Sequence, residues 1–199
     1  MATATNKVRF GLSRVHYAIW DEDQQKYGTP KPLAGAVSIS FEPQGSQSNF
    51  FADNTVYYIS NPTSQDTGSL EIADVSDEAA VELFGLKNDA VAGITYEETV
   101  HEMPTFALLY QVEGDGNTLR GVRYNVKMNR LSETHSTTTD SVEPQTYTVD
   151  YTATGRDFTV SGDTVNVIKA STTNGGQDHA AYDAWFDEVV CPGKAPTGA

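Results

Sequence analysis

Cysteine, basic residues and long apolar runs are all scarce in this 199-residue chain. The chain has a single cysteine, Cys191, so it cannot form an internal disulfide, which fits a reducing compartment. We interpret Cys191 as a small apolar residue after the last helix and not as a nucleophile. Lysine and arginine number 13 against 27 acidic residues, which gives a formal charge of −14. Because affinity for a phosphate backbone comes mainly from basic side chains, this balance argues against tight binding of nucleic acid.

No apolar run is long enough for a membrane helix, and the N-terminal stretch lacks the apolar segment of a secretory signal. We therefore expect the chain to fold and stay in the cytosol until it is assembled. With 38% hydrophobic residues the chain can bury a proper core, and β-rich chains of this length often form one domain. The sequence predicts a single domain over residues 1–199, with flexible termini at 1–6 and 191–199.

The sequence also lacks the motifs of common catalytic and cofactor sites. It contains no nucleophile elbow, phosphate loop or dinucleotide fingerprint. In the group of ionisable residues at 97–102, His101-Glu102 is followed by Met103-Pro104 and not by the second histidine of a zinc site. The turn at 114–117 lacks the later glutamate of a calcium loop. We predict no enzyme activity, metal or cofactor, although a carboxylate pair formed only in three dimensions stays open.

Alternating apolar residues predict antiparallel strands through most of the chain. Two half-buried faces are expected, and they are formed by Val15, Tyr17 and Ile19 and by Val37, Ile39 and Phe41. Residues 55–60 are apolar on both faces, which is typical of a strand covered on both sides by sheet, helix or a neighbouring molecule. Leu70 and Ile72 mark a further short strand.

The longest β unit is predicted over residues 106–154. A hairpin turn at 114–117 joins its first two strands, and the hydrophilic stretch 132–141 forms a mobile surface loop before the third. The second strand is expected to carry Val122, Tyr124, Val126 and Met128 on one face and Arg123, Asn125, Lys127 and Asn129 on the other. A last hairpin is predicted over 157–171, with its turn at Gly162-Asp163.

Two helices interrupt the strands. Ser76 can cap the first, with Asp77 and Glu78 in its first turn and Gly85 as its stop. The second helix is predicted to begin near Asp178. Core packing explains the helical spacing of its apolar residues Tyr182, Trp185, Phe186 and Val189.

Phe50 and Phe51 form the first candidate contact between subunits. They lie in a segment rich in Gly, Ser and Gln that is too polar for the core. Exposed paired aromatics usually mark a contact surface, whereas burial under the loop itself is the alternative interpretation.

A basic run in the second strand of the long β unit forms the other candidate contact. It contains Arg120, Arg123, Lys127 and Arg130 and no acidic residue. Arg123 and Lys127 share one strand face. Either Asp150 on the next strand balances that face, or it meets the acidic surface of a neighbouring subunit.

The order of these elements resembles that of the major tail proteins of long-tailed bacteriophages. The resemblance starts with the strand pair and polar loop of residues 8–54. It continues through the segment SDEAAVELFG, the strand block entered by Pro104, and Ala184-Trp185-Phe186-Asp187. It implies an antiparallel β-sandwich with a flanking α-helix and a second helix near the C-terminus, that is, a phage tail tube fold. In that family the polar loop, here Gly45 to Asn54, reaches toward neighbouring subunits.

The resemblance further implies a structural virion protein without catalytic activity. Its subunits would form hexameric rings, stacked into a tail tube around the tape measure protein, with the tail terminator and distal tail proteins as further partners. Genome DNA would pass through the channel without specific binding, which the acidic composition favours. The expected location is the virion tail, and the host cytoplasm during assembly; no membrane is involved.

A second function class stays open, namely a non-catalytic β-sandwich module that binds carbohydrate or decorates a virion. Exposed Trp20 or tyrosines would then form a sugar platform, and Trp20 lies opposite the face that contains Val15, Tyr17 and Ile19. Electron microscopy discriminates the two classes, because a tube protein forms hexamers or long tubules and a sugar-binding module stays a discrete particle.

Overall fold

The computed structural model describes residues 8–45, 48–60, 63–114, 116–132, 137, 145–174 and 180–197. The chain is mainly β, as predicted, and the helices found in the described residues are short. All strand pairs found there are antiparallel. Six predicted features lie outside the described residues, in whole or in part: the termini 1–6 and 191–199, the polar loop 45–54, the turn residue Asp115, the loop 132–141 and the helix start at Asp178.

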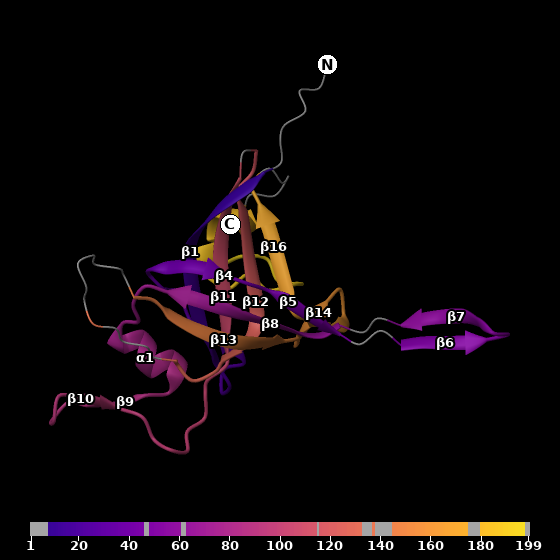
Figure 1. Ribbon diagram of the computed structural model, residues 1–199. Helices are drawn as coiled ribbons and strands as arrows, with labels where there is room; N and C mark the ends of the chain where they lie inside the picture. The colour runs from indigo at the N-terminus through magenta and orange to yellow at the C-terminus, as the bar shows by residue number, and fades with distance from the viewer. Residues whose placement is uncertain are drawn as a thin grey trace.

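One large sheet forms the body (Figure 1). Its strand order is β2 (Lys26–Tyr27), β1 (Arg9–Asp21), β11 (Phe106–Gly114), β12 (Leu119–Met128), β13 (Tyr147–Thr154), β8 (Thr63–Ile72) and β4 (Ala36–Ile39). Three more strands attach to it: β16 (Lys169–Thr173) on β12, β3 (Lys31–Pro32) on β1, and β5 (Glu42–Gly45) on β8. Separate hairpins are formed by β6 (Ser48–Ala52) with β7 (Thr55–Ser60), β9 (Lys87–Asp89) with β10 (Ile94–Tyr96), and β14 (Arg156–Val160) with β15 (Asp163–Val167).

The sheet folds at β12, and its two halves form the layers of the domain. β12 pairs with β16 through residues 119–123 and with β13 through residues 125–128. At this fork a β-bulge sets Tyr124 and Asn125 opposite the single residue Ala107 of β11. In Figure 1, β11 and β12 stand upright while β13 and β8 run across them. The layers of the predicted sandwich are therefore two halves of one continuous sheet.

The bulge also changes which way the side chains of β12 point. Val122 and Tyr124 belong to one core cluster, whereas Val126 and Met128 belong to the other. The prediction that all four share a face is wrong, because one extra residue in a strand reverses its alternation.

The larger core cluster joins both halves of the sheet to helix α1 (Asp77–Phe84). Its sheet residues include Val15, Tyr17, Leu70, Ile72, Phe106, Leu108, Val126, Met128, Val149 and Tyr151. The predicted burial of Val15 and Tyr17, and the strand at Leu70 and Ile72, are thus confirmed. Val37 departs from its predicted face and is exposed.

The C-terminal segment covers the other face of β1 and β11. It forms a short helix α2 (Ala180–Asp183) and a 3-10 turn η1 (Ala184–Phe186), less than the predicted helix. Trp185, Phe186 and Val189 pack against Ala18, Ala107, Leu109, Val122 and Tyr124. With cover on both faces, consecutive residues of β11 from Phe106 to Gln111 are all buried.

Residues beyond this helix also contact the body, while the flexibility of 191–199 stays a prediction and residues 198–199 lie outside the described residues. Cys191 packs against the second core cluster. The Thr197 hydroxyl donates to the Glu188 carboxylate over 2.6 Å, and the Thr197 amide donates to the same carboxylate. The segment 191–197 is thus linked to the body near both of its ends.

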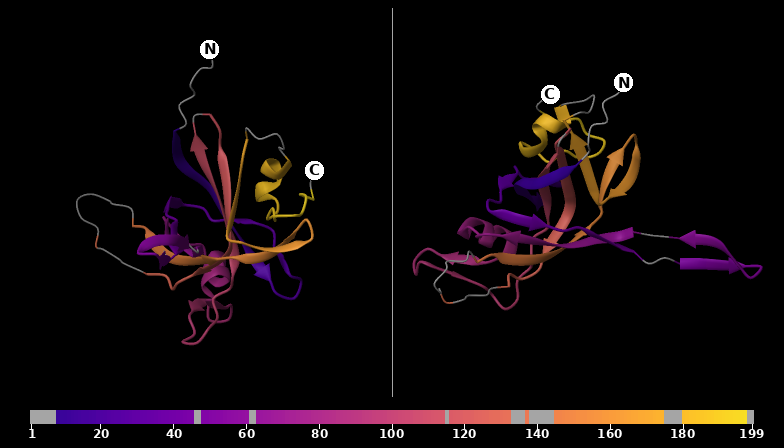
Figure 2. Two further views of the ribbon diagram at one scale, coloured as in Figure 1. Left: turned by 90° about the vertical axis from the view of Figure 1, so that its right-hand side faces the viewer. Right: turned by 45° about the horizontal axis from the view of Figure 1, so that its top comes forward.

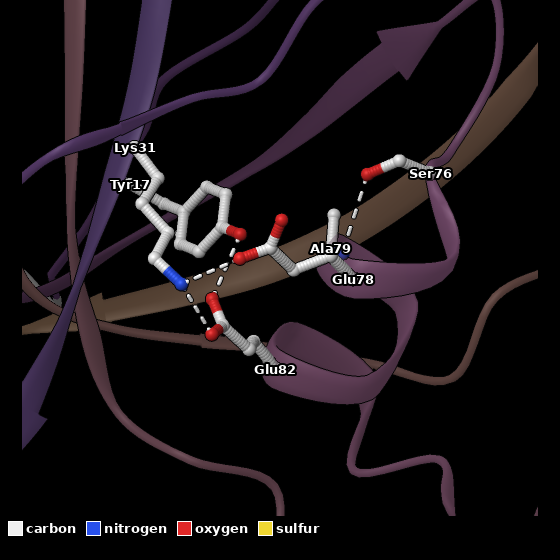
Figure 3. A network of polar contacts seen from close by, with 6 residues as sticks. All are labelled: Tyr17, Lys31, Ser76, Glu78, Ala79 and Glu82. Atoms are coloured by element: carbon white, nitrogen blue, oxygen red, sulfur yellow. Dashed lines mark hydrogen bonds and ion pairs between the residues drawn. The ribbon is translucent and has the colours of Figure 1, made fainter. Parts of the chain in front are cut away.

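Helix α1 begins and ends as the sequence predicts. The Ser76 hydroxyl accepts a hydrogen bond from the Ala79 amide over 3.3 Å, and Gly85 ends the helix in the left-handed region with φ of 66°. Figure 3 shows how the helix is tied to the strands: Lys31 Nζ donates to Glu78 over 2.8 Å and to Glu82 over 2.5 Å.

Tyr17 completes this network by donating its hydroxyl to Glu82 over 2.9 Å. The hydrogen bonds that Lys31 donates to Glu78 and Glu82 raise the pKa of its ammonium above its usual range. Because Lys31 and Glu78 are largely exposed, each ion pair contributes at most about 1 kcal/mol. The buried residues Ala79, Leu83 and Phe84 pack the helix into the larger core cluster.

Gly68 supplies a testable prediction about the fold. A Cβ at this position would lie 2.6 Å from the Tyr151 hydroxyl and would clash with the Ser40 carbonyl oxygen. We expect Gly68→Ala to lower the free energy of unfolding by about 1–3 kcal/mol, as for other overpacked sites. Urea denaturation measures the change.

Gly28→Ala is the matched control, since a Cβ there would meet only the Ile19 carbonyl oxygen at 3.6 Å. Equal stability of the two variants would contradict the close approach of β8 to β13.

Candidate functional site

The segment expected as a polar loop is a β-hairpin. β6 and β7 pair from Ser48↔Ser60 to Ala52↔Thr55. The turn residues Asp53 and Asn54 both have positive φ, 52° and 60°, as a two-residue hairpin turn requires. β5 and β8, which flank this hairpin in the sequence, pair with each other in the main sheet from Glu42↔Thr67 to Gly45↔Thr63.

This β6–β7 arm projects away from the body and exposes aromatic side chains (Figures 1 and 2). The exposed fractions are 61% for Phe50, 63% for Phe51, 76% for Tyr57 and 63% for Tyr58. Phe50 lies opposite Tyr58, and Phe51 lies opposite Val56, so the two faces of the arm are both apolar. Within one subunit nothing among the described residues covers either face.

The exposure of Phe50 and Phe51 argues against their burial under the loop. The sequence did not predict that Tyr57 and Tyr58 are exposed, because a strand that is apolar on both faces is usually covered on both faces. The scarcity of charged residues in the sequence could have indicated a contact surface here, because Asp53 is the only charged residue from residue 43 to residue 65. Exposed aromatics without charges are typical of the centre of a protein–protein interface.

Arg123 is not part of an exposed basic face. Its side chain is buried, donates from Nε to Asp66 over 2.9 Å and from a terminal nitrogen to the Tyr110 hydroxyl over 3.3 Å. Its guanidinium also lies 4.1 Å from the centre of the Phe41 ring. The bulge at residues 124–125 turns Arg123 into the core, and its acidic partner is Asp66 and not Asp150.

The remaining basic residues of the run are also separated. Arg120 is buried and donates from Nε to Gln111 over 2.9 Å. Arg130 forms an exposed ion pair with Glu97 over 2.7 Å. Lys127 is exposed on β12, so its contact with another subunit stays a prediction. The run therefore does not form one patch.

A cavity of about 630 Å³ lies between β1, β14 and the C-terminal segment, and Trp20, Tyr27, Phe158 and Cys191 are among its lining residues. The guanidinium of Arg156 lies 3.7 Å from the Trp20 ring centre, and Tyr27 meets the indole at 4.8 Å. Trp20 thus lacks the open face of a sugar platform. Burial raises the pKa of the Cys191 thiol to about 11, which leaves it a poor nucleophile at neutral pH.

The group at 97–102 serves as a connector. Glu97 binds Arg130, Glu98 binds Lys87 over 2.7 Å, and the His101 ring bonds the Glu98 carbonyl over 2.9 Å. Among the described residues no three His, Cys, Asp or Glu side chains lie close enough to hold a metal ion. In the same part of the chain no helix is both long and apolar enough to cross a membrane.

Compared with known proteins, the chain matches no protein-family model and no curated protein sequence.

The buried ion pair gives a prediction that separates two residues of the basic run. Arg123→Ala leaves the Asp66 carboxylate buried without its cation, so the free energy of unfolding should fall by about 3–5 kcal/mol. Lys127→Ala, four residues along the same strand and exposed, should change it by no more than about 0.5 kcal/mol. Chemical denaturation of both variants tests this; equal effects would contradict the burial of Arg123.

His16 gives a prediction about pH. Its ring lies 4.6 Å from the Phe186 ring and bonds the Arg14 carbonyl over 3.0 Å. Burial lowers the pKa of His16, and the Arg14 cation lowers it further. The unfolded chain therefore binds a proton more readily than the folded one, and stability should fall as the pH falls through about 6.5.

His16→Asn should weaken this pH dependence, because it keeps a donor for the Arg14 carbonyl and removes the titrating ring. The measurement is the difference in urea midpoint between pH 7.5 and pH 5.5 for both proteins. An unchanged difference in the variant would show that His16 does not contribute.

Proposed function

We propose that this protein is a structural tail tube subunit of a long-tailed phage, which assembles with copies of itself into stacked hexameric rings. The observation that carries the proposal is the β6–β7 arm, a projecting, almost uncharged hairpin with aromatic residues on both faces. A single two-stranded hairpin is marginally stable in water, and an exposed apolar patch of this kind marks an interaction site. A second copy of the chain provides cover for it.

The acidic body supports the same proposal. Each copy adds a formal charge of −14, so a ring built from this chain would carry a strongly negative wall. Such a wall repels the phosphates of DNA, and charges act over about 8 Å at physiological salt. Genome DNA would pass through the channel without binding to its wall. The tape measure protein, tail terminator and distal tail proteins are the further partners of this non-catalytic role, in the virion and during assembly in the host cytoplasm.

The mode of contact follows from the shape of the subunit. An arm at one side of a molecule that docks on a different surface of the next copy makes a heterologous contact. Such contacts close into rings or continue as a stack, depending on the rotation between copies. A tube of stacked rings therefore needs one contact that closes within each ring and another that continues from ring to ring.

Electron microscopy of the concentrated protein tests the proposal. The wild-type chain should form rings or long tubules in negative stain. Replacing Phe50 and Phe51 together by Ala removes two exposed rings from the arm, so it should abolish tubules and leave the circular dichroism spectrum of the folded subunit unchanged.

The control is Val165→Ala, which shortens an exposed apolar residue on the separate β14–β15 hairpin and should leave tubules intact. Unchanged tubules in the double variant would refute the role of the arm. A wild-type protein that stays a discrete particle and binds glycans would refute the tube and favour a carbohydrate-binding module.

A further inference from the structure

A second hairpin also exposes apolar residues without a partner in its own subunit. In β9–β10 and its loop, the exposed fractions are 99% for Val91, 54% for Ile94 and 41% for Tyr96. No charged residue occurs from residue 90 to residue 96. The hairpin tip, residues 90–96, is therefore an uncharged apolar surface on an acidic protein.

Local hydrogen bonds hold this tip in a defined shape. The Asp89 carboxylate accepts from the amides of Val91 and Ala92 over 2.9 and 3.1 Å, and the Asp89 carbonyl accepts from Gly93 over 2.8 Å. Gly93 has φ of 67°, which suits glycine. The turn is closed by its own polar groups, and Val91 is left pointing to solvent.

The hairpin is also anchored to the body at its base. Arg130, two residues after β12, binds Glu97 next to β10 over 2.7 Å, while Lys87 and Glu98 close the base of the hairpin itself over 2.7 Å. At the end of α1, a Cβ on Gly85 would come within 2.8 Å of the His101 ring. The tip is thus presented in one place relative to the sheet, as a docking surface requires.

The arm and this tip lie at opposite ends of the subunit. Figure 1 shows β6–β7 at the right and β9–β10 at the lower left, and the right-hand view of Figure 2 separates them in the same way. One copy cannot bring its own arm to its own tip. Any contact between them must join two copies, and it must be heterologous.

The distribution of charge favours a contact between these two segments. Copies with a charge of −14 repel one another wherever acidic surfaces meet. The arm has one charged residue between positions 43 and 65, and the tip has none between 90 and 96. Contact between them buries aromatic and aliphatic side chains without placing like charges together.

We propose that the β6–β7 arm of one copy packs on the β9–β10 tip of the next copy. The partner of the tip is thus a second copy of this chain. The inference rests on the proposed self-assembly and adds the identity of the surface that receives the arm.

Single-cysteine cross-linking tests the contact. In a Cys191→Ala background, Thr55→Cys places a thiol near the end of the arm and Ala92→Cys places one on the tip; both positions are exposed. The two variants are mixed, assembled and treated with a short bis-maleimide. A cross-linked dimer that contains one chain of each kind is the expected product.

Thr164→Cys on the β14–β15 hairpin replaces Ala92→Cys in the matched control, because it is also exposed at the end of a hairpin. That mixture should give no mixed dimer above background. As a second measurement, Val91→Asp puts a charge on the tip. It should abolish tubules without changing the circular dichroism spectrum, whereas Val165→Asp should leave tubules intact.

The outcomes separate the inference from the proposed function. Tubules together with the mixed dimer support both. Tubules that persist in Val91→Asp, or that give no mixed dimer with Ala92→Cys, overturn the docking of arm on tip and leave the tube intact. A wild-type chain that forms no oligomer at any concentration overturns both.

Discussion

The Arg123–Asp66 ion pair connects the two halves of the sheet at the point where they separate. Arg123 lies on β12 just before the bulge, and Asp66 lies on β8, which reaches β12 only through β13. Both side chains are buried, so each charge needs the other for its stability. The pair fixes how the halves are placed relative to each other, and the larger core forms between them.

The same pair links the core to the arm. Asp66 pairs with Ala153 on the core side of β8 and with Pro43 of β5 on the other side. From this point β5 and β8 lead out to the β6–β7 hairpin. A subunit that is correctly folded at Asp66 therefore holds β5 and β8, the strands that flank the arm in the sequence, in the main sheet.

Charge is distributed to suit such assembly. The body carries the excess of acidic residues, while the β6–β7 arm and the tip 90–96 carry aromatic and aliphatic residues with Asp53 as their single charged residue. Self-repulsion of the bodies disfavours random aggregation, and the hairpins leave few places where copies can approach. A free edge strand is a hazard for a soluble protein, and its use in a specific contact removes that hazard.

Sequence alone determined the features that depend on neighbours along the chain. The cap at Ser76 and the stop at Gly85 define α1, and the alternation at Val15 and Tyr17 defines β1, because caps and alternation act within a few residues. The aromatic pair at Phe50 and Phe51 was also recognisable as surface, since its neighbours are too polar for a core.

Only the tertiary structure decided what long-range packing controls. The bulge in β12 turned Arg123 inward, and no local pattern marks a bulge that arises from pairing with a strand elsewhere in the chain. The arm is a hairpin because residues 48–52 pair with residues 55–60, although the nearby Gly, Ser and Gln favour a loop. The contact of Arg156 with Trp20 and the packing of Cys191 on the second core cluster likewise required partners distant in sequence, which composition and periodicity do not encode.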